Sequence, residues 1–387
     1  MNKQEIFLAL VRNVICGEAV NDNLISACTP EMLEDVYSLA VKHDLHHLVG
    51  QALSKTGLPA SEALEKCKKA AMNAFVRHMQ RAHEYRRICQ VLEEAEIPYI
   101  PLKGSVLREY YPEAWMRTSC DMDILVKEEI LDQTAALITQ KLDYKADPRS
   151  DHDVALHAPT GVLLELHYDT IQERYEVNGC RDVLAAIWDH AAPKKEGSCH
   201  LWLSDEMFYF YHMAHMAKHF ASGGCGARAF LDIWIMNHKM SFGREKRYAL
   251  LENGGLLQFA KAAESLSEAW FSGAEPTQMD IALSDYILRA SLYGDNANRA
   301  ALGKAKSGGR LKYLLTQRVF MPYAYLKDEY PVLKKHKWLT PVYQVVRWVR
   351  MLFSGGLGST VKELKANAVS KESEEVEAEV LLKHLGL

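Results

Sequence analysis

The chain has 387 residues, of which 48% are hydrophobic and 25% are charged, and its formal net charge is −4. This composition predicts a globular protein of two or three domains. It excludes a surface built throughout for nucleic-acid phosphates, which needs an excess of basic residues, so nucleic acid ranks low among the expected partners.

The first helical pattern is at the N-terminus, where apolar positions are interrupted by Arg12, Asn13 and Glu18, unlike the continuous apolar segment of a signal peptide. No run reaches the length of a membrane span. Eight cysteines are scattered without a Cys-x-x-Cys pair, as is typical of reduced thiols. We therefore expect a cytoplasmic protein without a membrane span.

Apolar residues at intervals of three and four predict helices over residues 3–18, 30–56 and 61–95. Thr29-Pro30-Glu31 is a typical helix start, because proline suits the first helical position. Residues 1–95 are therefore expected to form an N-terminal helical region.

A mixed α/β core is predicted over residues 96–203, and it begins with an apolar strand from Ile97 to Leu102. A turn at Lys103-Gly104-Ser105 follows and opens a short helix. Glycine allows the backbone to approach an anion closely, and the first N–H groups of a helix are unpaired. The turn therefore indicates a phosphate site at Gly104 and Ser105, although a tight turn with Ser105 as an N-cap is the structural alternative.

The segment Asp121-Met122-Asp123 begins the next apolar strand. Side chains alternate across a strand, so both aspartates project from one face while Met122, Ile124 and Val126 face a core. Mg²⁺ prefers oxygen ligands and is usually held by one or two carboxylates together with substrate phosphates. The pair therefore indicates a metal site.

A third acid lies in the apolar run from Gly161 to Tyr168, where Glu165 and His167 share one face. A carboxylate within such a strand needs a metal or a cation nearby, unless the strand lies at a sheet edge with Glu165 in water. We expect His167 either to contact substrate or to orient Glu165. Further strands are expected near residues 153–157 and 200–203.

Ser204-Asp205-Glu206 predicts the start of a helix that carries His212, His215 and His219 on one face. Zinc binding is one interpretation, but no further ligand is evident, and polar packing or substrate contact is the alternative. After the glycine-rich loop 222–227, Arg228 and Asp232 are four residues apart, a spacing that allows an ion pair on one helix turn. The alternative to a structural ion pair is that this helix forms a wall of the nucleotide or acceptor pocket. Residues 204–295 are assigned to this helical region.

The last region, 296–387, mixes basic and aromatic residues between positions 310 and 353 and ends in an acidic helix or tail. Basic residues interleaved with aromatic ones bind RNA or an anionic membrane surface in some proteins. More often they form packed helices whose cations extend to solvent.

The motifs LKGSVL, DMDILV with the preceding Arg117, and LELHYD resemble those of a bacterial family, uncharacterised nucleotidyltransferase family 5, within the DNA polymerase beta-type nucleotidyltransferase superfamily. The resemblance extends from the N-terminal helices to about residue 235. Lys103 stands where many relatives have glycine. The stretch before Asp121 is longer than in the shortest relatives, and Tyr110, Tyr111 and Trp115 within it suggest an aromatic lid.

The resemblance implies roles for the predicted residues. Asp121, Asp123 and Glu165 would bind Mg²⁺, or Mn²⁺ in its place, and Glu165 would also orient or deprotonate the attacking hydroxyl. The residues expected to bind the nucleoside triphosphate or to form the wall of its pocket are Lys103, Gly104, Ser105, Arg117, His167, His215, His219, Arg228 and Asp232.

The expected fold class is α+β, with a small mixed-sheet nucleotidyltransferase core flanked by N-terminal and C-terminal helical regions. The expected reaction moves a nucleoside monophosphate from an NTP to a hydroxyl of a small molecule or a protein and releases pyrophosphate. The alternatives are a phosphotransferase that uses the same turn and a catalytically silent nucleotide-binding or partner-binding module.

Overall fold

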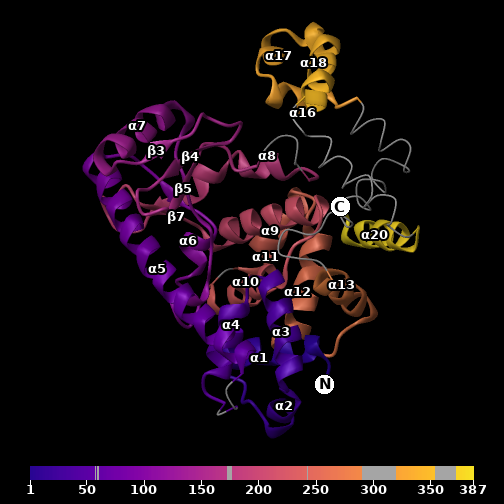
Figure 1. The fold of residues 1–387 in the computed structure, drawn as a ribbon. Coiled ribbons are helices and arrows are strands. Elements are labelled where there is room, and N and C mark those ends of the chain that lie inside the picture. The colour runs from indigo at the N-terminus through magenta and orange to yellow at the C-terminus, as the bar shows by residue number, and fades with distance from the viewer. Residues whose placement is uncertain (57, 59–60, 172–176, 242, 290–319, 354–371) are drawn as a thin grey trace.

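Helices dominate the computed structural model and flank a five-stranded mixed sheet (Figure 1), which confirms the predicted α+β class. The structure describes residues 1–56, 58, 61–171, 177–241, 243–289, 320–353 and 372–387. Within this described part, no helix is both long enough and apolar enough to cross a membrane.

Five helices precede the sheet: α1 (Lys3–Cys16), α2 (Asp22–Ala27), α3 (Pro30–Lys42), α4 (His46–Leu53) and α5 (Glu62–Glu94). Thr29 caps α3 as predicted, since its side chain accepts from the Met32 amide. The prediction of one helix over residues 30–56 was wrong. The chain turns between α3 and α4 because Asp44 has a positive φ of 54°, a conformation that aspartate tolerates better than most residues.

The sheet contains the strands β1 (Ile100–Pro101), β2 (Asp121–Leu125), β3 (Lys145–Ala146), β4 (Asp153–His157) and β5 (Leu163–His167). Their order is β1-β2-β5-β4-β3, and β2 pairs with β5 in parallel while the other pairs are antiparallel. In the parallel register Asp123 lies opposite Glu165. Because β5 is an inner strand, the alternative that placed Glu165 at a sheet edge was wrong.

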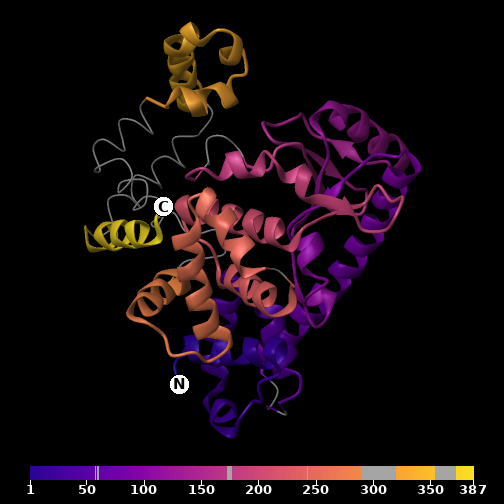
Figure 2. The ribbon, with the colours of Figure 1, turned by 180° about the vertical axis from the view of Figure 1, so that it is seen from behind.

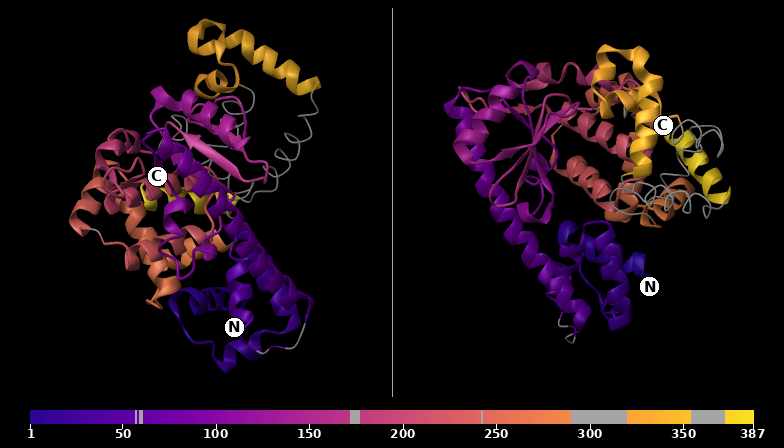
Figure 3. Two further views of the ribbon diagram at one scale, coloured as in Figure 1. Left: turned by 90° about the vertical axis from the view of Figure 1, so that its left-hand side faces the viewer. Right: turned by 45° about the horizontal axis from the view of Figure 1, so that its top comes forward.

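The two faces of the sheet differ as the alternation of residues predicted. Met122, Ile124 and Val126 are buried in an apolar layer with residues of α5 and of α7 (Leu131–Leu142). Figure 3 shows the long helix α5 running from the N-terminal helices along the sheet. The opposite face carries Asp121, Asp123 and Glu165, so the acidic side chains are excluded from this core.

Helices after the core cover the acidic face. This part contains α8 (Cys180–Leu184), a hairpin of β6 (Ala191–Pro193) and β7 (Leu201–Leu203), and then α9 (Asp205–Ala221), α10 (Ala227–Lys239), α11 (Arg244–Asn253), α12 (Leu257–Phe271) and α13 (Gln278–Arg289). Ser204 caps α9 by accepting from the Met207 amide, as predicted. Figure 2 shows α9 to α12 between the sheet and the N-terminal helices, with which they share one apolar core.

The C-terminal region contains α16 (Tyr323–Glu329), α17 (Val332–Lys335), α18 (Thr340–Phe353) and α20 (Glu372–Leu385). Of the basic-aromatic stretch, residues 310–319 lie outside the described residues. Within the described part, the rings of Tyr330 and Tyr343 are 4.9 Å apart, whereas Phe320 and Trp338 are 56% and 76% exposed, so only part of the stretch is packed. The acidic end of the chain is helical, and Leu381, Leu382 and Leu385 belong to the main core.

Candidate active site

A cavity of about 280 Å³ lies between the acidic face of the sheet and the helices α9 and α10. Most of the side chains predicted to act in a nucleotide site line it, although they come from distant parts of the sequence. They are Lys103, Gly104, Arg117, Asp121, Asp123, Glu165, His215, His219, Arg228 and Asp232. Ser105 and His167 do not line the cavity: Ser105 is half-buried in α6 (Gly104–Leu107), and His167 is buried behind the acids.

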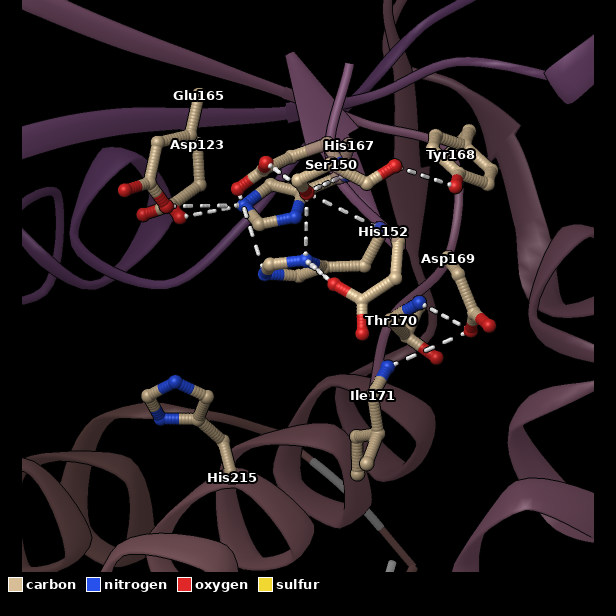
Figure 4. Close-up of polar contacts among 12 residues, drawn as sticks. Asp123, Ser150, His152, Glu165, His167, Tyr168, Asp169, Thr170, Ile171 and His215 are labelled. Carbon is tan, nitrogen blue, oxygen red and sulfur yellow. Dashed lines mark hydrogen bonds and ion pairs between the residues drawn. The ribbon is translucent and has the colours of Figure 1, made fainter. Parts of the chain in front are cut away.

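The acidic centre is built on the parallel pairing of β2 and β5. Asp123 is 2% exposed, and its Oδ1 accepts from Lys103 Nζ at 2.6 Å and from His167 Nε2 at 2.9 Å. His167 Nε2 also lies 3.4 Å from Glu165 Oε2. Figure 4 shows the side chains of Asp123, Glu165 and His167 pointing toward one another, with His215 of α9 on the opposite side. His167 therefore orients both acids, which is one of the two roles predicted for it.

Two close groups of metal-ligand atoms are present among the described residues. One contains Asp123, Glu165 and His167, whose ligand atoms lie within 4.8 Å of one another, and the other contains His152, Asp153 and His167. Asp121 lines the same cavity but belongs to neither group. The predicted metal site consisted of the carboxylates of Asp121, Asp123 and Glu165. In the structure, His167 takes the place of Asp121 in the close group.

The charges of the acidic centre are only partly balanced. Burial raises the pKa of Asp121, and the carboxylate of Asp123 raises it further. Burial would also raise the pKa of Asp123, but the Lys103 ammonium and the hydrogen bond from His167 hold it well below its usual range. The hydrogen bond from His167 likewise lowers the pKa of Glu165. An additional cation near Asp121 would lower its pKa and so stabilise the charged site.

This donor set fits a divalent cation. Carboxylate oxygens of Asp121, Asp123 and Glu165 border one cavity, and hard oxygen ligands are those that Mg²⁺ and Mn²⁺ accept. The Lys103 ammonium donates to Oδ1 of Asp123 at 2.6 Å, and its hydrogen bonds within the described residues do not include Oδ2 of this carboxylate.

The turn before α6 has an unusual backbone. Lys103 has φ 46° and ψ −122°, a conformation that glycine adopts readily and that strains a residue with a Cβ atom. Arg108 secures the turn, because its Nε donates to the Gly104 carbonyl at 2.6 Å and its Nη2 donates to Ser119 Oγ at 3.1 Å. A Cβ atom on Gly104 would lie 3.3 Å from the Cβ of Ser119. The backbone therefore passes close to Ser119 at this point, and glycine suits the position.

A buried ion pair joins the core to α10. Arg117 Nε and Nη2 donate to the two carboxylate oxygens of Asp232, each at 2.7 Å, and Tyr111 donates to Oδ1 at 2.7 Å. The predicted pairing of Arg228 with Asp232 was wrong, because Arg228 pairs with Asp44 instead. Thr118 also donates to Asp44, at 2.8 Å. Side chains from three separate regions thus stabilise the loop before β2.

The predicted aromatic lid was also wrong. Tyr111 is buried with its hydroxyl on Asp232, and Tyr110 and Trp115 pack against the main apolar core. None of the three lines the cavity. The long stretch before Asp121 therefore supplies packing and the Arg117 anchor.

The histidines of α9 form part of the cavity wall. His215 and His219 lie 3.2 Å apart between their Nε2 atoms. Burial lowers the pKa of His212 and of His219 to about 4, and lowers that of His215 further below its usual value, so these rings are neutral at neutral pH. Neither close group of metal-ligand atoms in the described part includes them, which argues against the zinc interpretation.

Several residues of the site were not predicted, among them Arg108, Ser119 and His152. His152 lies in the polar run Ser150-Asp151-His152-Asp153 at the start of β4, and its ring centre is 5.5 Å from that of His167. A polar run at the start of a predicted strand is a sequence signal from which His152 could have been predicted as a site residue. Arg108 follows Gly104 by four residues, a spacing at which helical residues meet.

Comparison with known proteins gives one family. A family model described as uncharacterised nucleotidyltransferase matches residues 29–272, which include the sheet, the cavity and α9–α12. No curated protein and no solved structure matches the chain.

The strain at Lys103 can be measured with two variants that remove the same ammonium group. Lys103→Gly and Lys103→Ala both leave Asp123 without its cation, but only glycine relieves the positive φ. We therefore expect Lys103→Gly to have a free energy of unfolding higher by about 1 kcal/mol in urea titrations. Equal stability of the two variants would contradict the strained turn.

The buried pair of Arg117 and Asp232 should dominate the stability of this part of the fold. Asp232→Ala leaves Arg117 buried without its carboxylate and should cost about 3–5 kcal/mol. Glu109→Ala, which breaks the exposed pair with Lys194, should cost no more than about 1 kcal/mol. Similar losses of unfolding free energy in both variants, measured by urea denaturation, would show that the buried pair stabilises the fold no more than an exposed pair does.

The same pair predicts a dependence on pH. Burial would raise the pKa of Asp232, but Arg117 more than offsets this and lowers it. The stabilisation is therefore complete above the unfolded pKa of about 4 and is lost as the pH falls through the lower folded pKa. As the pH falls over this range, the free energy of unfolding of Arg117→Met/Asp232→Leu should accordingly decrease less than that of the natural sequence.

Proposed function

Since the chain belongs to the family of uncharacterised nucleotidyltransferases, we propose that it transfers a nucleoside monophosphate from an NTP to a hydroxyl-bearing acceptor. Mg²⁺ is the proposed cofactor, and pyrophosphate is the proposed leaving group. The observation that carries the proposal is the parallel register of β2 and β5, which sets Asp123 beside Glu165 at the wall of one cavity.

Each side of the cavity suits one part of the substrate. Gly104 lines the cavity, and we assign the triphosphate to this side together with Lys103. Arg117 has its Nε and Nη2 occupied by Asp232, so we assign it a positioning role. The neutral histidines 215 and 219 face the acids from α9 and are suited to hydrogen bonding with the nucleoside or the acceptor.

The proposed reaction is an in-line displacement. The acceptor oxygen forms a bond to the α-phosphorus, the bond from this phosphorus to the bridging oxygen breaks, and pyrophosphate leaves. The proton of the acceptor hydroxyl passes to Glu165, whose carboxylate is ionised at neutral pH because the hydrogen bond from His167 lowers its pKa. Its side chain is 26% exposed and therefore accessible from the cavity. Bound Mg²⁺ would neutralise the phosphate charge and bring the reacting oxygens together.

The position of His167 supports this assignment for Glu165. His167 is buried and lies between Asp123 and Glu165, so it limits the motion of the base and separates two carboxylates that would otherwise repel. Its own pKa is raised by these acids in spite of burial.

Two labelled substrates distinguish the proposed reaction from its alternatives. The protein is incubated with Mg²⁺ and each NTP labelled at the α- or the γ-phosphorus, in the presence of cell-extract small molecules. Nucleotidyl transfer puts the α-label on an acceptor and the γ-label in pyrophosphate. A phosphotransferase would put the γ-label on the acceptor, and binding without transfer of either label would favour the silent module.

Substitution of the proposed base should separate chemistry from binding. Glu165→Gln is expected to keep its affinity for Mg²⁺-NTP within a few fold and to lose about 10² to 10⁴ in turnover. Glu129→Gln, at an exposed glutamate outside the cavity, is the matched control and should retain full turnover. Calorimetry and pyrophosphate release measure the two quantities. An active Glu165→Gln enzyme would exclude this residue as the base.

A further inference from the structure

A second cavity of about 310 Å³ adjoins the candidate active site. It lies between α4 and the long helix α5 and is bordered on one side by the loop residues Thr118, Ser119 and Cys120. Ser119 and Cys120 also line the first cavity, and Asp121 follows them directly. The two cavities therefore share a border at the short segment that leads into β2.

The second cavity is strongly cationic. Among the described residues that line it, the cations are Lys66, Lys69, Arg77 and Arg81, and Asp44 is the one carboxylate. Asp44 is already paired with Arg228 and accepts from Thr118. Its negative charge is thus balanced from the side of the first cavity, and the charge of Lys66 is balanced by Glu34 and Glu62. Lys69, Arg77 and Arg81 therefore give the second cavity its excess of positive charge.

The buried side chain of Arg81 is the main evidence for a ligand in this cavity. Its residue is 7% exposed, it lines the cavity, and its Nε is buried without a hydrogen-bond partner among the described residues. Burial lowers the pKa of Arg81, and nearby Arg77 also acts to lower it. Arg117, in contrast, is equally buried but satisfied by a carboxylate. The carboxylates of Asp121 and Asp44 act to raise this pKa, but neither forms an ion pair with Arg81 in the described part of the chain. A buried guanidinium without a directly bound anion is costly, so its retention indicates a ligand that supplies the anion.

We propose that this cavity binds the phosphate group of the acceptor, so that the acceptor is a phosphorylated small molecule with a free hydroxyl. The proposal rests on the proposed function. A phosphate offers several oxygens and up to two charges, which matches a guanidinium with further cations around it. With the phosphate held here, the hydroxyl reaches across Ser119 and Cys120 to the acids beyond. There it attacks the α-phosphorus, releases pyrophosphate and gives its proton to Glu165.

The shape of the surroundings favours a small molecule over a nucleic-acid strand. A volume near 300 Å³ is at the lower end for small-molecule sites. The neighbouring exposed residues of α5 include Met72, Phe75, Val76 and Met79, which are 45–64% exposed and apolar. Four of the seven lysines and arginines of α5 line the cavity, and the other three, Lys68, Arg86 and Arg87, lie outside it. A cavity of this volume suits a small phosphorylated molecule better than a polymer backbone.

The test uses inorganic phosphate, without NTP or Mg²⁺, on the full chain by calorimetry. Arg81→Gln and Arg77→Gln should each weaken phosphate binding by about tenfold or more. Arg86→Gln removes one exposed charge from the same helix outside the cavity and should leave binding unchanged. The melting temperature of Arg81→Gln should be no lower than that of the natural sequence, because the substitution removes an unpaired buried charge. Arg77 is exposed, so its variant decides the result even if Arg81→Gln fails to fold.

Three comparisons complete the test. Glycerol 3-phosphate should bind and glycerol should not, and a short single-stranded RNA should not displace phosphate. Asp121→Asn/Asp123→Asn should still bind phosphate, which separates failure of this inference from failure of the proposed transfer. The inference is overturned if phosphate affinity is unchanged in the Arg77 and Arg81 variants, or if RNA binds better than glycerol 3-phosphate through the same arginines.

Discussion

The structure depends on the need to balance negative charge where β2 and β5 pair in parallel. The register places Asp123 opposite Glu165, and Asp121 lines the same cavity. Buried carboxylates at this separation repel one another unless cations or hydrogen-bond donors intervene. Lys103 and His167 meet this need for Asp123, and the lysine adopts a glycine-like backbone conformation at the point where it does so. The remaining charge on Asp121 is what a divalent cation would balance in the proposed reaction.

The second constraint concerns the position of the loop before β2. The loop before β2 has to be rigid for the acids to keep their geometry, yet it contains little regular structure. It is held by the Arg117–Asp232 pair and by Asp44, which pairs with Arg228 and accepts from Thr118. These interactions connect the turn between α3 and α4, the loop and α10. They also explain how two cavities can adjoin at Ser119 and Cys120, since the segment between them is fixed from both sides.

Local patterns predicted the parts of this site that depend on local structure. Strand alternation predicted that Asp121 and Asp123 share a face, and the caps at Thr29 and Ser204 predicted two helix starts. The α+β class followed from the same patterns. Partner choice could not be predicted, because it depends on contacts between distant segments: Arg228 and Asp232 have helical spacing but pair with Asp44 and Arg117. For the same reason the sequence did not reveal that Lys103 contacts Asp123 or that Arg81 lies buried in a second cavity.

The most direct measurement is the location of the metal and the nucleotide in crystals grown with Mn²⁺ and an α,β-methylene triphosphate, since anomalous scattering identifies Mn²⁺ without ambiguity. The account predicts an anomalous peak coordinated by Asp121 and Asp123, with the triphosphate beside Gly104 and the α-phosphorus facing Glu165. A nucleotide bound elsewhere, or a metal that contacts neither aspartate, would contradict it.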